Sequence, residues 1–150
     1  MDLAITQVPV WLSILFIISF STIPVFLINQ AVKSAYENGN YSEAIQYFQK
    51  VPATDANHTE ALFYLGHSYY QNKNYDAATS TFQQVAATKD IRYMEAAEWY
   101  QVVNTLAAGK VDANFNVLLN KIADDGGHTY HHNALELRGQ LNSFWRKLKF

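Results

Sequence analysis

The sequence predicts an all-α protein, in which an N-terminal transmembrane helix is followed by a short α-solenoid and a C-terminal capping helix. Two observations support this fold class. Residues 41–51 and 75–85 match each other at a fixed offset of 34 positions, and residues 3–32 contain no charged side chain. A fixed period of this length is typical of stacked helical hairpins that bury their apolar faces against one another. We therefore expect an anchor over residues 1–30 and a repeat domain of about three repeats plus a cap over residues 31–150.

The predicted anchor helix runs from Val8 to Ile28 and is overwhelmingly apolar. As a helix it would be about 31 Å long, close to the ~30 Å hydrocarbon core of a bilayer. Trp11 lies near one end, where indole rings favour the membrane interface. A cleaved signal peptide is a second interpretation, but the stretch lacks a basic start and a small-residue cleavage site. A buried helix is a third, although a three-repeat array has little room to enclose a helix that is apolar all round.

Basic residues flanking a span favour the cytoplasmic side of the membrane. Lys33 is the first basic residue after the apolar stretch, and none precedes it. We therefore expect a single-pass membrane protein whose repeat domain lies in the cytoplasm.

The two matching segments share the residues that pack paired helices. Small residues, represented by Gly66 and Ala78, allow two helix backbones to approach closely, and Leu65, Tyr69 and Phe82 fill the space between them. The residues that recur at the 34-residue offset are Tyr41, Ala44, Phe48 and Val51, which match Tyr75, Ala78, Phe82 and Val85.

Residues 61–85 resemble a tetratricopeptide repeat, with Leu65-Gly66 and Tyr69 in the first helix and Tyr75, Ala78 and Phe82 in the second. The resemblance covers roughly residues 33–148. From residue 61 onward the chain is also similar to tetratricopeptide proteins often found in Bacteroidetes-type bacteria, many of which are membrane-anchored. The resemblance implies a protein-interaction scaffold rather than an enzyme, with no cofactor.

The flanking repeats follow the pattern less closely. The first, roughly residues 27–51, has Ala31-Val32 where the second has Leu65-Gly66. The third, roughly residues 92–124, drifts to an offset of about 37. In it we expect one helix from about residue 95 to 108, ended by a glycine, and a partner helix over residues 111–123 with one apolar face of Phe115, Leu118, Leu119 and Ile122.

A last helix, near residues 130–148, is predicted to cap the open end of the stack, since terminal repeats need a polar outer face. Its expected apolar side consists of Leu135, Leu137, Leu141, Phe144, Trp145 and Leu148.

The resemblance implies that the first helix of each repeat lines a concave binding face. Aromatic side chains suit partner contact because they bury a large area at low entropic cost. The alternative is that these residues pack against neighbouring helices or the cap. A basic clamp of the kind that binds a C-terminal carboxylate is not visible. Carried onto this sequence, the predicted partner-binding residues are Lys33, Tyr36, Glu60, Phe63, His67, Tyr70, Tyr100 and Asn104, flanked by Glu37 and Gln71.

Composition and motifs argue against other functions. The formal charge of −2 gives no basic footprint for nucleic acid, and the absence of cysteine excludes thiolate chemistry. No nucleophile elbow, phosphate loop or dinucleotide fingerprint occurs. His128, His131 and His132 form a metal-like cluster, but we interpret it as part of the cap because closed metal sites need three or four well-placed ligands. We therefore expect no enzyme activity, metal or cofactor.

Two functions remain open at this point. The first is a membrane-anchored scaffold or assembly factor that binds a partner protein or peptide. The second is a structural subunit of a membrane complex that assembles through its span. A homo-oligomer is one form that such a complex could take. Ser13, Ser19, Ser21 and Thr22 are the small hydroxyl residues in that span, and such residues support helix packing in lipid.

Overall fold

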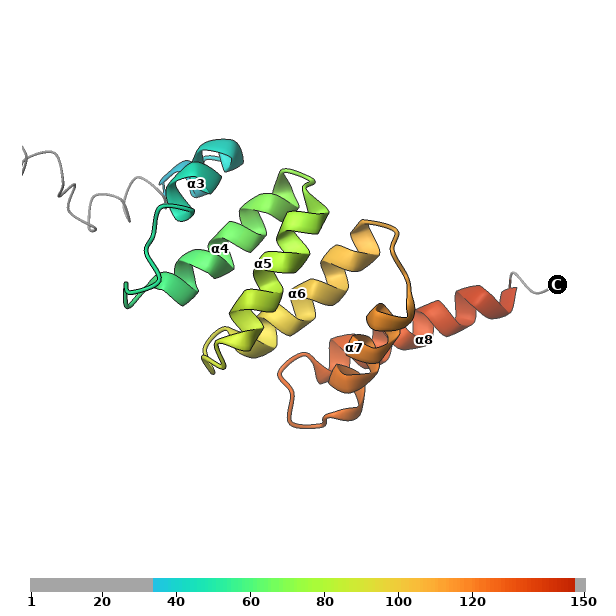
Figure 1. The fold of residues 1–150 in the computed structure, drawn as a ribbon. Helices are drawn as coiled ribbons and strands as arrows, with labels where there is room; N and C mark the ends of the chain where they lie inside the picture. Colours follow the sequence, from blue (N-terminus) through green and yellow to red (C-terminus); the bar gives the residue numbers. More distant parts are fainter. Residues whose placement is uncertain (1–33, 148–150) are drawn as a thin grey trace, which may run out of the picture.

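The computed structural model describes residues 34–147, and within this range every regular element is helical (Figure 1). A single helical turn at residues 34–37 comes first. The longer helices are α3 (Tyr41–Phe48), α4 (His58–Gln71), α5 (Tyr75–Ala87), α6 (Met94–Ala107), α7 (Ala113–Asp124) and α8 (His131–Lys147).

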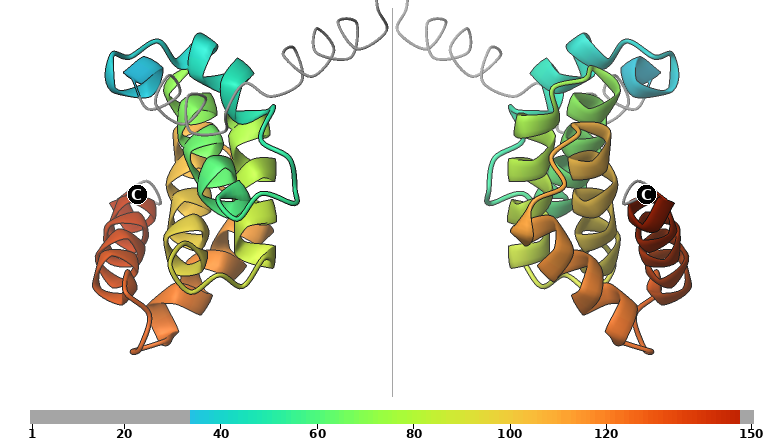
Figure 2. Two further views of the ribbon diagram at one scale, coloured as in Figure 1. Left: turned by 90° about the vertical axis from the view of Figure 1, so that its left-hand side faces the viewer. Right: turned by 90° about the vertical axis from the view of Figure 1, so that its right-hand side faces the viewer.

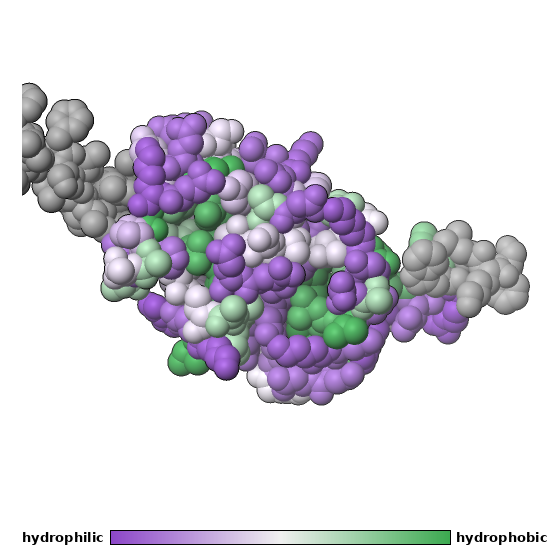
Figure 3. Space-filling view, in the orientation of Figure 1, coloured by the Kyte–Doolittle hydropathy of each residue, from purple (hydrophilic) through white to green (hydrophobic). Residues whose placement is uncertain are grey.

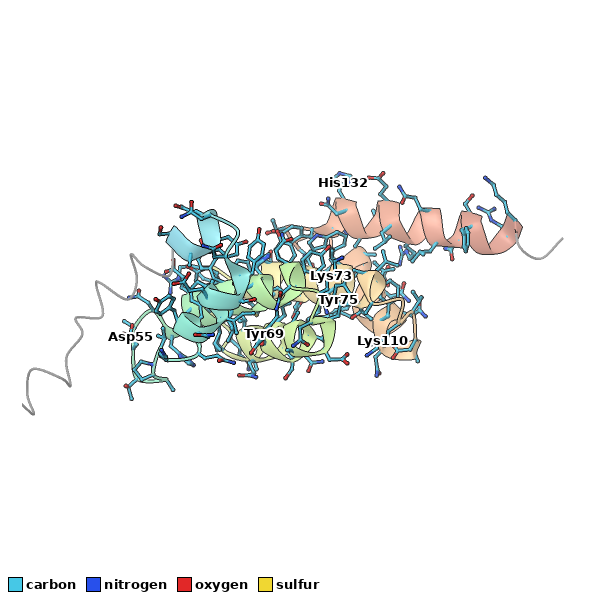
Figure 4. All side chains as sticks on the ribbon, turned by 90° about the horizontal axis from the view of Figure 1, so that it is seen from above. Asp55, Tyr69, Lys73, Tyr75, Lys110 and His132 are labelled. Atoms are coloured by element: carbon cyan, nitrogen blue, oxygen red, sulfur yellow. The ribbon has the colours of Figure 1, made fainter. Side chains whose placement is uncertain are left out.

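Each helix packs on its neighbours in sequence, from α3 through to α8, and the contacts are most extensive among α4, α5 and α6. Two perpendicular views show α5 on one side of α4 and α6, and α8 on the other side (Figures 2 and 4). His132 on α8 and Lys110 at the start of the α7 segment accordingly lie on opposite sides of the molecule (Figure 4). We call α4 and α6 the inner helices, and α8 stands beside their exposed side.

The hairpin turns repeat the same backbone geometry. The second residue after the first helix of each hairpin is left-handed at Gly39, Lys73 and Gly109, with φ of 77°, 59° and 70°. The next amide in each turn bonds back across the helix end, as Asn74 N–H does to Tyr69 O at 2.8 Å. This is the Schellman arrangement, which satisfies the last helical carbonyls. The expected stop at Gly109 is confirmed.

Side chains then cap two of the outer helices. The Asp112 carboxylate accepts the Phe115 N–H at 2.9 Å at the start of α7, and the Asn74 side chain accepts the Ala77 N–H at 3.4 Å at the start of α5. Such caps satisfy amides that have no partner within the helix.

The buried core is divided into three clusters that follow the repeats. The first joins α3 to α4, the second joins α4, α5 and α6, and the third joins α6, α7 and α8. Their buried members are, in turn, Ala35, Ala44, Phe48, Val51, Ala61 and Leu65; Ala78, Phe82, Val85 and Ala97; and Val102, Phe115, Leu119, Ile122, Ala123 and Ala134.

The close approach of α4 and α5 depends on Gly66, as the sequence predicted. A Cβ at this position would lie 2.7 Å from Cε1 of Phe82, whose side chain is 1% exposed. Ala78 is fully buried in the same interface. The repeated residues therefore form the core.

The apolar side of α8 differs from the prediction. Ala134 is buried, and Leu137 and Leu141 pack on the third cluster. Leu135 and Phe144, however, are 37% and 55% exposed. A narrow stripe suffices here because α7 is the one helix that α8 contacts extensively, and the C-terminal part of α8 extends beyond α7 (Figure 1).

An outer groove of about 420 Å³ opens between α5, α6 and α7. Its walls are polar, with Asp76 and Lys110 among them, and Val102 and Phe115 lie in its floor. Figure 3 shows hydrophobic residues in this region, between α6 and α7.

Over residues 34–147, no helix combines the length and apolar character needed to cross a bilayer. The predicted span from Val8 to Ile28 lies outside the described residues.

Candidate partner-binding face

Aromatic rings follow the inner helices, from Tyr36 in the first repeat to Tyr130 just before α8. Each of these side chains keeps part of its surface in solvent. We call this surface the aromatic face, and its members are Tyr36, Phe63, Tyr64, His67, Tyr93, Trp99, Tyr100 and Tyr130.

Phe63, His67 and Tyr100 form the centre of the aromatic face. The His67 ring lies edge-on to both neighbours, with centroids 4.6 Å from Phe63 and 4.2 Å from Tyr100. Phe82 lies beneath them, 5.2 Å from His67 and 5.7 Å from Tyr100. Edge-to-face and offset pairs of this kind stabilise the packing beyond the area they bury. The centre of the face is therefore fixed by three helices.

The aromatic face continues in both directions from this centre. Toward the N-terminal side, the Tyr64 ring is 5.5 Å from the Tyr36 ring. Toward α8, Tyr100 lies 6.5 Å from Tyr130, which stacks on Trp99 at 5.7 Å with only 8° between the planes. One surface thus spans every repeat in the described region.

Three tyrosine hydroxyls of the aromatic face, those of Tyr36, Tyr93 and Tyr130, remain protonated at neutral pH. Burial raises the pKa of Tyr36, Tyr93 and Tyr130 above its usual value. At Tyr93 the neighbouring Glu60 carboxylate contributes further, because it accepts the phenol hydrogen bond. The face therefore presents neutral hydroxyl groups, which can both donate and accept hydrogen bonds.

His67 is held in its neutral form. Burial among the surrounding rings lowers its pKa from 6.5 to about 4. Burial has this effect because a low-dielectric environment disfavours the charged imidazolium. At neutral pH the His67 ring therefore behaves as one more aromatic group.

Most of the predicted partner-binding residues do lie together. Tyr36, Phe63, His67 and Tyr100 are members of the aromatic face, and Glu60 borders it through its bond to Tyr93.

The remaining predicted residues lie elsewhere. The Tyr70 ring faces Tyr75 at 6.0 Å, at the far end of α4. Gln71 and Glu37 are exposed at the same end of their helices. Lys33 lies outside the described residues.

Asn104 does not fit the role predicted for it. Its side chain is fully buried, and its Nδ2 donates to Tyr75 O at 2.7 Å and to Thr79 Oγ1 at 2.5 Å. It therefore joins α6 to the start of α5 and has no surface to offer a partner. The carry-over failed here because the offset of the third repeat drifts, which turned a packing position into an apparent surface position.

Sequence reasoning missed half of the aromatic face, namely Tyr64, Tyr93, Trp99 and Tyr130. Tyr93 and Tyr130 immediately precede α6 and α8. The sequence pattern placed Tyr130 at the start of the capping helix and gave neither residue a place on the binding face. Both tyrosines directly precede an inner or capping helix. This shared position at the junction between repeats is the sequence signal that could have identified them.

One member of the predicted histidine cluster, His128, lies in a contact with Glu98 and Lys121. We call this contact the Glu98 clasp. Glu98 on α6 is 9% exposed and accepts a bond from Lys121 Nζ at 2.5 Å. Its other oxygen faces His128 Nε2 at 3.5 Å. The Tyr130 N–H donates to His128 Nδ1 at 3.0 Å, so the neutral ring carries its proton on Nε2, toward Glu98. The clasp joins α6, α7 and the loop before α8.

The other two histidines do not complete a metal site with it. The His131 ring lies 5.8 Å from that of His132, and His132 is exposed. In the part of the chain that the structure describes, no group of three or more acidic or histidine side chains is placed to hold a metal ion.

Comparison with known families agrees with this geometry. Residues 35–97 match the family model described as tetratricopeptide repeat. This part of the chain is similar to tetratricopeptide repeats. Such repeats generally mediate protein–protein interaction, and proteins that contain them are generally non-catalytic scaffolds. No curated protein matches the chain. The match covers α3, α4, α5 and the start of α6, so α7 and α8 extend the array by their geometry alone.

Proposed function

We propose that this protein is a scaffold or assembly factor that binds a segment of a partner protein on its aromatic face. The observation that supports this most directly is the continuous, partly exposed row of rings on the inner helices. Rigid aromatic side chains are favoured at interfaces because they bury much area while few torsions are immobilised.

The tetratricopeptide match adds support, because repeats of this kind generally bind proteins. The arrangement of the face supports it further. Phe82 and the surrounding core fix the rings from beneath, so little ordering entropy is lost when a partner docks.

The test is a crosslinked affinity purification of the full chain, comparing it with a Tyr36→Ala/Tyr64→Ala double variant. These two rings lie at the N-terminal end of the face, where Tyr64 is 37% exposed and Tyr36 is partly buried against the first core cluster. Phe63 is a poorer target, because it contacts Phe82, Tyr93 and Tyr100 and its loss would disturb the core. We expect the partner to be lost from the double variant while helical content stays unchanged.

Tyr47→Ala provides a matched control. This tyrosine lies on α3, where its hydroxyl bonds Glu43 and its ring lies under Lys50, away from the aromatic face. We expect it to retain the partner. A partner set that is unchanged in the double variant would contradict the proposal and move the interaction to the predicted span.

We further propose that residues Val8–Ile28 anchor the protein in a membrane as a single span, with the repeat domain on the cytoplasmic side. The support is the uncharged stretch and the position of Lys33 after it. We expect the full chain to be extracted by detergent but not by high salt or alkaline carbonate. Recovery of the full chain in the soluble fraction without detergent would contradict the anchor and leave the binding proposal standing.

A further inference from the structure

Two carboxylates lie in the first turns of the inner helices, along the edge of the aromatic face. Glu60, near the start of α4, accepts the Tyr93 hydroxyl hydrogen bond, and Glu95, near the start of α6, accepts the Thr129 N–H at 2.9 Å and the Thr129 hydroxyl. The Thr129 bonds lower the pKa of Glu95, so it stays ionised at neutral pH. The inner helices α4 and α6 thus each place one carboxylate beside the rings.

Positive charge on the aromatic face is already neutralised. The Arg92 guanidinium lies over the Tyr93 ring at 5.2 Å and pairs with Asp90 at 2.8 Å. Over residues 34–147, no other lysine or arginine lies over a ring of this face. Because the pKa of His67 is about 4, its ring adds no positive charge at neutral pH.

The remaining ion pairs direct basic side chains elsewhere. Lys110 pairs with Asp76 at the outer groove, and Arg138 pairs with Asp124 between α7 and α8. Lys121 is held by the Glu98 clasp. Arg92 also interacts with the Glu60 carboxylate, so this one guanidinium serves both Asp90 and Glu60. With Glu95 beside them, carboxylates outnumber cations at the edge of the aromatic face, which therefore combines electron-rich rings with a net negative charge.

We propose that the aromatic face selects partner segments that carry arginine side chains, an inference that rests on the proposed function. A guanidinium group stacks on tyrosine faces and pairs with carboxylates through its planar donors. Arg92 on Tyr93 is an example of this stacking within the chain itself. Glu60 and Glu95 provide the charges that an arginine-bearing segment needs, and they would repel an acidic one.

The test measures binding of synthetic peptides to the full chain in mild detergent by fluorescence anisotropy. One peptide alternates arginine with leucine, a second replaces arginine by lysine, and a third replaces it by glutamate. We expect the arginine peptide to bind at least about tenfold more tightly than the glutamate peptide, with lysine between them, because only arginine both stacks and pairs. The affinity should fall at high ionic strength.

Variants assign that selectivity to the face. Glu60→Gln/Glu95→Gln should weaken arginine-peptide binding about three- to tenfold, since exposed ion pairs contribute modestly. Tyr64→Leu keeps the apolar volume but removes the aromatic ring and should weaken it about two- to fivefold. Glu136→Gln, on the exposed side of α8, is the matched control and should bind like the parent chain.

Equal or tighter binding of the glutamate peptide, or binding that is insensitive to Glu60→Gln/Glu95→Gln, would overturn the arginine proposal. If the natural partner is still lost from Tyr36→Ala/Tyr64→Ala in that case, the aromatic face binds a partner of other chemistry and the proposed function stands. Peptide-independent self-association that Tyr64→Leu abolishes would instead identify a second copy of this chain as the occupant and overturn the proposal.

Discussion

Gly39 and Lys73 occupy the same place in consecutive repeats, and both are left-handed. The conformation costs a non-glycine residue about 1–2 kcal/mol, which is partly offset because glycine loses more entropy on folding, about 0.5–1 kcal/mol. We expect Lys73→Gly to stabilise the protein and Gly39→Ala to destabilise it, each by about 0.5–1 kcal/mol. No atom lies within 4 Å of a Cβ at Gly39, so the backbone alone is tested. Urea denaturation would measure the change in the free energy of unfolding for both variants. Stabilisation by Gly39→Ala would show that the left-handed conformation does not carry this cost.

Gly66 illustrates the opposite case, in which space rather than backbone conformation requires glycine. Gly66→Ala should cost about 1–2 kcal/mol, because overpacking against Phe82 outweighs the gain in helix propensity. Gly139→Ala is the control: it lies within α8 with nothing within 4 Å of its Cβ and should stabilise the protein by about 0.5–1 kcal/mol. Thermal unfolding of both variants distinguishes the two effects.

His67 should make stability depend on pH. Its pKa falls from 6.5 in the unfolded chain to about 4 in the fold, so the unfolded state binds the proton more readily. The contribution of the neutral His67 ring to stability is fully present above about pH 6.5, and the free energy of unfolding falls by about 2–3 kcal/mol as the pH drops toward 4. Across this pH range, the free energy of unfolding should change less with pH in His67→Phe than in the parent chain. An equal slope in both proteins would show that other groups cause the loss.

At the scale of elements, the Glu98 clasp is the contact that holds the capping region to the repeats. Glu98→Ala removes the carboxylate that faces the buried His128 ring and frees Lys121, which should cost about 1–3 kcal/mol. Hydrogen exchange should accelerate first in α7 and α8 and little in α4. Glu136→Ala on the exposed side of α8 should leave both helices protected, and uniform acceleration by Glu98→Ala would contradict a local role.

The helices themselves were largely predictable from the sequence. The 34-residue offset correctly placed α3, α4 and α5, because small and large residues at set positions leave few ways to pair two helices. Contacts between repeats were not predictable in the same way. Glu98 lies far along the chain from both Lys121 and His128, and neither partner is marked by a motif. Asn104 was misplaced for a related reason, since one helical step separates a surface position from a buried one.

At the scale of the whole molecule, the described chain is a linear stack with two ends. The α4–α5–α6 region packs on both sides, whereas α3 and α8 pack chiefly on one neighbouring helix. In such arrays stability is the sum of repeat and interface terms, so end elements open more readily. We expect native-state hydrogen exchange to be slowest in α5 and faster toward α3 and α8. Equal protection throughout would indicate one cooperative unit.

Because each helix packs on its neighbour in sequence, the protein can fold in the order in which it is synthesised. Contacts that are local in sequence form quickly, and domains begin to fold while synthesis continues. The α4–α5 hairpin, with its Gly66–Phe82 contact, has its full set of internal partners by Ala87. Each helix that is made later can therefore pack on a hairpin whose own contacts are already complete in the chain, without waiting for distant segments.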